Sequence, residues 1–214
     1  MPVRQAAIAA CILVSAVACR DAHRINRETT KPTYDSKTGR LTDLTYDSNV
    51  DGRIDTWIDM DGARPLRARI DGNQDGRVDR WEEYDGAGRL VKVGYSQQDD
   101  GRPDAWAYPA VNGRVERIEM FRSGDRSRMD RREVYDPSLA DVQNALLRVE
   151  EDTNGDGRID KWETFEAGAL KTAAWDENGD GVADRRFTYR GSIPTLLETD
   201  PDSSGRFMRV IELR

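Results

Sequence analysis

Aspartate, asparagine and glycine recur at fixed spacing in four segments of this 214-residue chain. Each segment follows the pattern D-x-N-x-D-G-x-[IVA]-D, with starts at Asp47, Asp71, Asp152 and Asp176 that fall into two pairs 24 residues apart. Carboxylate, amide and main-chain carbonyl oxygens are the ligands that Ca²⁺ takes on a flexible loop. The spacing therefore predicts four calcium-binding loops and Ca²⁺ as the cofactor.

Each position of the pattern has a predicted task. Positions 1, 3 and 5 offer side-chain oxygens, Gly at position 6 allows a sharp bend, position 7 offers its carbonyl, and position 9 adds a carboxylate. Two loops also carry Glu at position 12, and these two are expected to bind calcium most tightly. The predicted ligands are Asp47, Asn49, Asp51, Arg53 and Asp55; Asp71, Asn73, Asp75, Arg77, Asp79 and Glu82; Asp152, Asn154, Asp156, Arg158, Asp160 and Glu163; and Asp176, Asn178, Asp180, Val182 and Asp184.

The loops resemble EF-hand calcium loops and the calcium loops of thrombospondin type 3 repeats, over most of residues 47–205. The loops Asp71–Glu82 and Asp152–Glu163 match the EF-hand loop pattern in full. An EF-hand also needs a helix on each side of its loop, whereas the residues between these loops carry a turn signal. A lone EF-hand around Asp152, preceded by a helix at 137–150, is the alternative, and it would make the protein a calcium sensor or buffer.

The opposing interpretation is a set of Asp-rich turns that bind no metal. Four copies in register favour calcium, because without a cation each loop would crowd like-charged carboxylates together. Zinc is disfavoured, since His23 is the single histidine, and magnesium dehydrates reluctantly. Weaker copies begin at Ser96, Arg122 and Asp200, and those at Ser96 and Arg122 are expected to bind calcium poorly or not at all. Protease is expected to cut the chelated array first near residues 96–132.

The segments between the loops predict the fold. Each has an aromatic residue, a polar turn with Gly and an apolar residue, as in Tyr34–Leu41 and Tyr84–Leu90. Such turns between apolar runs are hairpin signals. The sequence therefore predicts an all-β fold, an antiparallel meander or solenoid-like array of short β-hairpins linked by calcium-binding loops. Pro137 and the spacing of the apolar residues after it predict one short helical insertion near 137–147.

Aromatic residues recur in two registers of the repeat. They could stack across strands as a thin core, or form a surface that binds a glycan or protein partner. One register holds Trp57, Trp81, Trp106 and Trp162, and the other holds Tyr84, Tyr108, Tyr135, Phe165 and Tyr189.

The first residues predict export. The apolar run from Ala6 to Ala18 is too short to span a bilayer and fits a secretion signal. Ala16-Val17-Ala18-Cys19 resembles the lipobox of bacterial lipoproteins, which implies a lipid on Cys19 and a cell-envelope location. Arg20 after it resembles outer-membrane sorting, and an ordinary signal peptide cut after Ala18 is the alternative. The predicted divisions are a signal peptide at 1–18, a lipidated Cys and flexible tether at 19–33, and a repeat domain of roughly 24-residue units at 34–214.

Composition narrows the function further. Only 37% of the residues are hydrophobic, 34% are charged and the net charge is −7. Such a chain has a thin core and is a poor partner for nucleic acid, which requires clustered basic residues. No catalytic residue is predicted, because His23 lies in the tether and no nucleophile motif is present. The expected function is a calcium-binding, membrane-anchored repeat lipoprotein with a structural or surface-interaction role.

Overall fold

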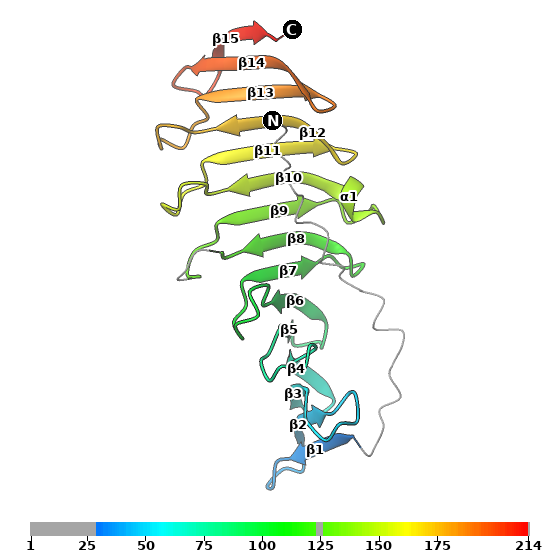
Figure 1. Ribbon diagram of the computed structural model, residues 1–214. Helices are drawn as coiled ribbons and strands as arrows, with labels where there is room; N and C mark the ends of the chain where they lie inside the picture. The colour runs from blue at the N-terminus through cyan, green and yellow to red at the C-terminus, as the bar shows by residue number, and fades with distance from the viewer. Residues whose placement is uncertain (1–28, 123–125, 214) are drawn as a thin grey trace.

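The computed structural model describes residues 29–122 and 126–213. They form one antiparallel sheet of 15 strands in chain order, so each strand pairs only with its neighbours in sequence (Figure 1). The predicted all-β meander is confirmed. The strands are β1 Thr30–Tyr34, β2 Leu41–Tyr46, β3 Thr56–Asp61, β4 Arg64–Ile70, β5 Arg80–Tyr84, β6 Leu90–Tyr95, β7 Ala105–Pro109, β8 Val115–Met120, β9 Arg131–Tyr135, β10 Leu146–Glu151, β11 Lys161–Glu166, β12 Ala169–Trp175, β13 Arg185–Arg190, β14 Ile193–Pro201 and β15 Phe207–Glu212.

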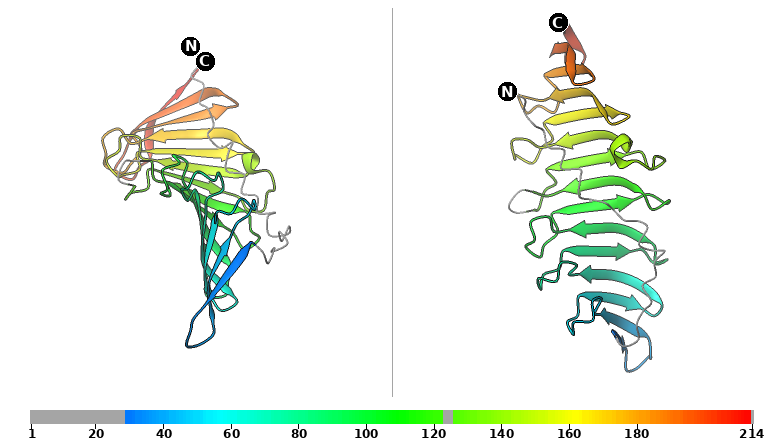
Figure 2. Two further views of the ribbon diagram at one scale, coloured as in Figure 1. Left: turned by 60° about the horizontal axis from the view of Figure 1, so that its bottom comes forward. Right: turned by 45° about the vertical axis from the view of Figure 1, so that its right-hand side comes forward.

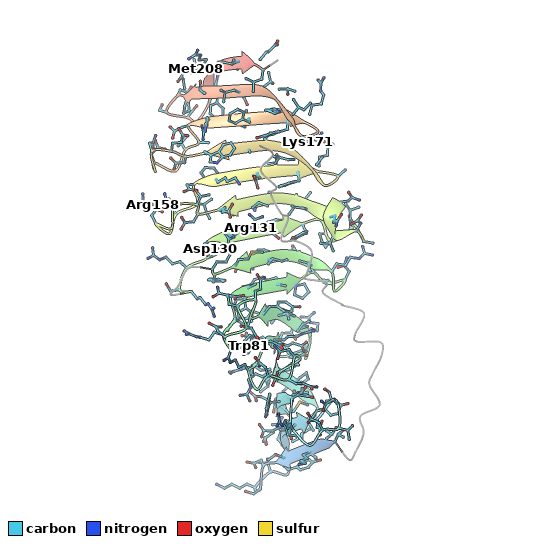
Figure 3. The ribbon with its side chains drawn as sticks, in the orientation of Figure 1. Trp81, Asp130, Arg131, Arg158, Lys171 and Met208 are labelled. Carbon is cyan, nitrogen blue, oxygen red and sulfur yellow. The ribbon has the colours of Figure 1, made fainter. Side chains whose placement is uncertain are left out.

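The two long edges of the sheet differ in their connections. Every second connection lies at the same edge, called here the loop edge, and the tight turns lie at the opposite edge (Figure 1). Figure 3 labels Arg158 on the loop edge and Lys171 toward the turn edge. Because the meander is strictly sequential, all predicted calcium loops fall side by side on one edge. These loops are 47–55, 71–79, 152–160 and 176–184. The degenerate loop 96–104 lies between the second and the third, as do Arg122 and Asp130 of the other degenerate copy.

The sheet is a single twisted layer (Figure 2). Within residues 29–122 and 126–213 there is no second sheet, and the one helix is a single turn at the turn edge. The buried apolar side chains lie mainly on one face, because the central residues of successive strands pair with one another and therefore point the same way. This central row includes Ala68, Val93, Ala107, Ile118, Val149 and Ala173.

The largest apolar cluster lies in the middle of the array. Ala105 and Ala107 of β7 pack with Ile118 and Met120 of β8, and Tyr135 and Ala145 join them. Toward either end the sheet has fewer buried side chains. The hydrophobic contribution to stability is therefore concentrated around β7–β9.

Two sequence predictions need correction. The sheet begins at Thr30, so residues 30–33, predicted to be part of a flexible tether, form strand β1 with Leu41–Tyr46 as partner. The helical insertion is present, but it is only the single turn α1, Val142–Ala145. Asp141 caps it by accepting the N–H of Gln143, and Leu146 already begins β10. The apolar spacing from Pro137 onward is therefore not a helix face.

The tryptophans lie on the face opposite the central row. Trp57, Trp81, Trp106 and Trp162 each precede a central-row residue by one position and so point the other way. All four are half-buried, and an intervening strand separates each from the next. They therefore do not stack on one another. The Trp106 ring lies over Gly94, and the ammonium of Lys92 lies 4.1 Å from that ring's centre.

The contact between Gly94 and Trp106 gives a direct test of this face. A Cβ at position 94 would lie 2.9–3.1 Å from three atoms of the Trp106 ring. We expect Gly94→Ala to lower the free energy of unfolding by about 1–3 kcal/mol, the usual cost of overpacking. Gly86→Ala, which meets nothing within 4 Å, is the control. Equal urea midpoints for the two variants would contradict the placement of the ring.

Candidate metal-binding loops

The aspartates at positions 1 and 9 form a row along the loop edge that is interrupted at Ser96 and Phe121. The backbone ladder extends through them, since Asp71 donates its N–H to the carbonyl of Asp55 at 2.8 Å and Asp176 donates to Asp160 at 2.9 Å. Members on directly paired strands therefore lie about one strand spacing, roughly 4.8 Å, apart along the edge. Most members are buried. This aspartate row comprises Asp47, Asp55, Asp71, Asp79, Asp104, Asp130, Asp152, Asp160, Asp176 and Asp184.

The position 1 carboxylate organises each predicted loop. In the loop 152–160, one oxygen of Asp152 accepts the N–H of Gly155 and the other accepts that of Gly157, both at 2.7 Å. Asp47 and Asp176 make the same two bonds in their loops. The residues at positions 4 and 6 have positive φ angles, which Gly adopts without strain. This bend is the task predicted for Gly at position 6.

The side chains at positions 3 and 5 are held by the turns that follow them. The amide oxygen of Asn154 accepts the N–H of Asp156, and the carboxylate of Asp156 accepts the N–H of Arg158, both at 2.8 Å. The same bonds recur in the other three predicted loops. Each side chain therefore has a fixed direction while keeping lone pairs free for a ligand.

The position 9 aspartates serve mainly to close the loops. Asp160 accepts the N–H groups of Thr153 and Asn154 at 2.9 and 3.2 Å, and Asp55 accepts that of Ser48 at 2.8 Å. Asp79 and Asp184 bond the second and third residues of their loops in the same way. Like the oxygens at position 1, these oxygens already accept hydrogen bonds, so a cation would use the remaining lone pairs of these side chains and the carbonyl at position 7.

One oxygen in the second loop fits a cation directly. Asp71 accepts the N–H of Gly76 with Oδ2, while its Oδ1 is buried and has no hydrogen-bond partner. A buried carboxylate oxygen without a partner is costly, and a hard cation would satisfy it. In residues 29–122 and 126–213 no three Asp, Glu, His or Cys side chains converge as a metal-binding group. Amide and main-chain oxygens would therefore have to complete the shell.

The loops favour ionised carboxylates. Burial opposes ionisation of Asp176, but the backbone N–H groups of Gly181 and Gly179 outweigh it and hold its pKa below the ordinary value. The N–H of Arg53 and then the Asn49 amide lower the pKa of Asp51. A depressed pKa means that Asp176 stabilises the fold above the unfolded pKa and loses this effect as pH falls through the folded value. The pKa values of Asp176 and Asp51 are thus both held below that of a free aspartate.

The two Glu residues at position 12 lie elsewhere. Glu82 is on β5, where it pairs with Arg80 and accepts a hydrogen bond from Tyr84. Glu163 is on β11 and pairs with Lys161 at 2.9 Å. Among the described residues, neither carboxylate has a hydrogen bond or ion pair with its loop. The predicted ranking of the loops by position 12 therefore loses its structural basis.

A third strand explains why Glu recurs at this position. Arg131, Glu133 and Tyr135 of β9 repeat the same arrangement, with Arg131 2.8 Å from Glu133 and the Tyr135 hydroxyl donating to it. Burial first, and then Glu133, raise the pKa of Tyr135 far above its ordinary value. This strand follows a degenerate loop, so the triplet is a feature of the strand face. Its recurrence after a weak copy was the sequence signal that could have revealed this role.

Neighbouring loops are tied to each other. The Asn49 amide donates to Gln74 at 2.6 Å, and the Asn73 amide donates to Asp99 at 3.0 Å, so position 3 of one loop reaches position 4 of the next. The side chains at position 7 do the same, with Arg77 donating to the carbonyl of Asp99 at 2.7 Å and Arg158 to that of Gly179 at 3.2 Å. Nothing in the single-loop pattern predicts these ties.

Comparisons with known proteins give no family. No protein-family model matches the chain, and no curated protein matches it. A solved structure described as accessory secretory protein 1, 2 and 3 in Streptococcus pneumoniae aligns with 52% of this chain at 14% identity and a TM-score of 0.38. The chain spans only 20% of that protein. This likeness carries no functional argument.

The placement of Glu82 predicts separable effects of two substitutions. Glu82→Gln should lower the free energy of unfolding by about 1–3 kcal/mol, because it weakens a charged hydrogen-bonded triplet. It should leave the calcium Kd of the second loop nearly unchanged. Asp71→Asn should instead weaken calcium binding, as measured by isothermal titration. If the Glu82→Gln variant lost as much calcium affinity as the Asp71→Asn variant, Glu82 would be a calcium ligand after all.

Proposed function

We propose that the protein is a calcium-binding repeat protein whose ions hold together the loop edge of a single-layer sheet. The observation that carries the proposal is the aspartate row, with the partnerless buried oxygen of Asp71 within it. Ten carboxylates in a row repel one another, and in the four predicted loops no side-chain cation of the described residues pairs with the aspartate at position 1. Divalent cations at these loops would relieve that repulsion.

Calcium suits the donors better than other divalent ions do. The loops offer carboxylate, amide and carbonyl oxygens, which are hard ligands, and the bends at Gly52, Gly76, Gly157 and Gly181 keep the loops adaptable. Calcium accepts such irregular shells, while magnesium demands near-ideal octahedral geometry. The loops at Asp47, Asp71, Asp152 and Asp176 would hold the ions. The loop at Asp152 is flanked by β10 and β11, so the lone EF-hand with flanking helices is wrong.

The proposed location rests on the sequence. Cys19 and the whole predicted signal peptide lie outside the described residues, as does His23. No helix within the described ranges is long and apolar enough to cross a bilayer. Anchoring to the cell envelope through a lipid on Cys19, with the array as a structural or interaction module, is therefore part of the proposal.

Removal of calcium provides the test. A bound ion present at a hundredfold excess over its Kd stabilises the fold by about 2.7 kcal/mol, so several ions should raise the melting temperature strongly. We expect EDTA to lower the melting temperature, calcium to restore it and equimolar magnesium to restore it poorly. Asp152→Asn should lose part of this calcium-dependent shift.

Asp85→Asn is the matched control for Asp152→Asn. Asp85 accepts N–H groups from Ala87 and Arg89 at 2.8 and 2.9 Å in a tight turn at the opposite edge. Its loss should lower stability equally with and without calcium. Identical melting curves of the wild-type protein in EDTA and in calcium would mean that the loops are turns that bind no metal.

A second function is favoured by the face that carries the tryptophans. A cavity of about 270 Å³ lies beside Trp81 and is lined by Arg67, Arg69, Asp59 and Glu83, among others. Aromatic and charged groups together suit a sugar ring, through stacking and hydrogen bonds. Titration with envelope oligosaccharides should shift the tryptophan fluorescence, and Trp81→Phe should abolish the shift. Trp175→Phe, on the other face, should retain it, and equal loss in both variants would argue against this surface.

A further inference from the structure

The degenerate loop 96–104 keeps the backbone of the predicted calcium loops without their first ligands. Ser96 and Gln98 replace the acid and amide at positions 1 and 3. Asp99 and Gly101 nevertheless have φ angles of +53° and +76°, at the positions where Gly155 and Gly157 have +79° and +91°. The loop therefore adopts its bend although the sequence predicts only weak calcium binding there.

Two of the acids in this loop, Asp100 and Asp104, stand at predicted ligand positions, and one of them is almost inaccessible. Asp104, at position 9, is 2% exposed and accepts the N–H groups of Gln97 and Gln98 at 2.9 and 3.0 Å. Asp100, at position 5, accepts the N–H of Arg102 at 3.1 Å and the hydroxyl of Ser96, at position 1, at 3.3 Å. An ionised carboxylate buried this deeply needs a nearby positive charge.

A side chain from the next loop supplies that charge. Arg126 donates two hydrogen bonds to the two oxygens of Asp100, at 2.9 and 2.8 Å, and a third to the carbonyl of Arg102 at 3.0 Å. Its guanidinium also lies 3.9 Å from Asp104. The Arg126 side chain is only 12% exposed and that of Asp100 is 36% exposed, so water reaches this pair mainly from the carboxylate side.

The groups around Arg126 are those that the loop pattern assigns to a metal ion. Asp100, the carbonyl of Arg102 and Asp104 stand at positions 5, 7 and 9 of the loop. Hydrogen bonds from Arg126 are the main cause of the lowered pKa of Asp100. Arg126 itself stands at position 5 of its own loop, where the four strong loops have Asp. The loop 96–104 thus lacks the acid at position 1, where it has Ser96, and the next loop has the base Arg126 in place of an acid.

We infer that Arg126 is a built-in cation for the loop 96–104 and occupies the place that calcium would take in the strong loops. The neighbouring degenerate loop follows the same logic, because the guanidinium of Arg122 lies 2.9 Å from Asp130 at position 9. The middle of the aspartate row is therefore neutralised by covalently attached cations. Calcium is therefore required to neutralise only the parts of the aspartate row on either side of this middle segment.

This assignment divides the array into three parts. The metal-independent centre, β6–β9, coincides with the largest apolar cluster of the sheet. The flanking parts around 47–79 and 152–184 hold the proposed calcium loops, and this division rests on the proposed function. Removal of calcium should loosen the two flanks and leave the centre folded. This reverses the sequence expectation that protease would cut first near residues 96–132.

Hydrogen–deuterium exchange of the full chain in EDTA tests Arg126 without reference to calcium. Arg126→Gln should speed amide exchange in residues 96–104 by on the order of tenfold or more, as expected when a charge-assisted hydrogen bond is lost. Arg102→Gln is the matched control. It removes the same charge from the loop itself, and the structure describes no hydrogen bond or ion pair of its side chain. Equal exchange in the two variants would overturn the assignment of Arg126.

A second pair of variants tests the exclusion of metal. Ser96→Asp with Gln98→Asn restores the missing ligands, yet we expect no additional calcium by isothermal titration while Arg126 is present. Adding Arg126→Gln should create one further site. An extra ion bound equally in both backgrounds would contradict the inference. A wild-type protein that binds no calcium would defeat the proposed function alone, because the exchange test in EDTA would still decide the role of Arg126.

Discussion

Mutual repulsion among the carboxylates of the aspartate row is the main constraint on this fold. A sequential meander places the first and ninth residues of every loop on neighbouring strands, so acids that recur at those positions line up along one edge, here with interruptions at Ser96 and Phe121. The same acids are indispensable locally, since each one fixes the N–H groups of its loop. The fold therefore generates a line of negative charge that it cannot remove without losing its loops.

The single-layer architecture makes this constraint more severe. A sheet with both faces open buries few side chains, and the described residues have one modest apolar cluster, around Ile118. Ion pairs across and along the strands add to it, as between Arg186 and Glu198 or between Arg122 and Glu151. Pairs of this kind are worth little when exposed. Neutralisation of the negative charge at the loop edge is therefore a large part of the free energy that can favour the folded chain over an extended one.

The ties between loops give neighbouring sites a physical connection. Asn73 orders one loop through its own turn and also donates to Asp99 in the next, and Arg158 reaches from its loop to the carbonyl of Gly179. An ion that fixes one loop therefore also restrains part of the next. In a repeat array whose units contact only their neighbours, stability is approximately the sum of the stabilities of the single repeats and of the interactions between adjacent repeats. The ties between loops belong to these nearest-neighbour interactions.

The sequence predicted the meander and the position of the loops because both follow from the strict alternation of the D-x-N-x-D-G pattern with hairpin turns. It failed where one residue type serves two purposes. Glu82 and Glu163 satisfy the EF-hand pattern by number, but they belong to strand-face triplets with Arg80 and Lys161. The sequence did not predict the role of Arg126, because this side chain pairs with Asp100 of a different repeat and the pattern describes one repeat at a time. The half-buried tryptophans could be placed in register, but their surroundings depend on residues of the neighbouring strand, such as Gly94 beside Trp106.

The number of ions bound is the quantity that tests this account most directly. Native mass spectrometry of the calcium-loaded protein, before and after treatment with chelator, counts them without any assumption about stability. We expect one calcium ion for each of the loops at Asp47, Asp71, Asp152 and Asp176, all removed by chelator, and none for the loop 96–104 that Arg126 neutralises. A protein that carries no calcium at saturating concentration, or one that carries an ion for every loop including 96–104, would contradict it.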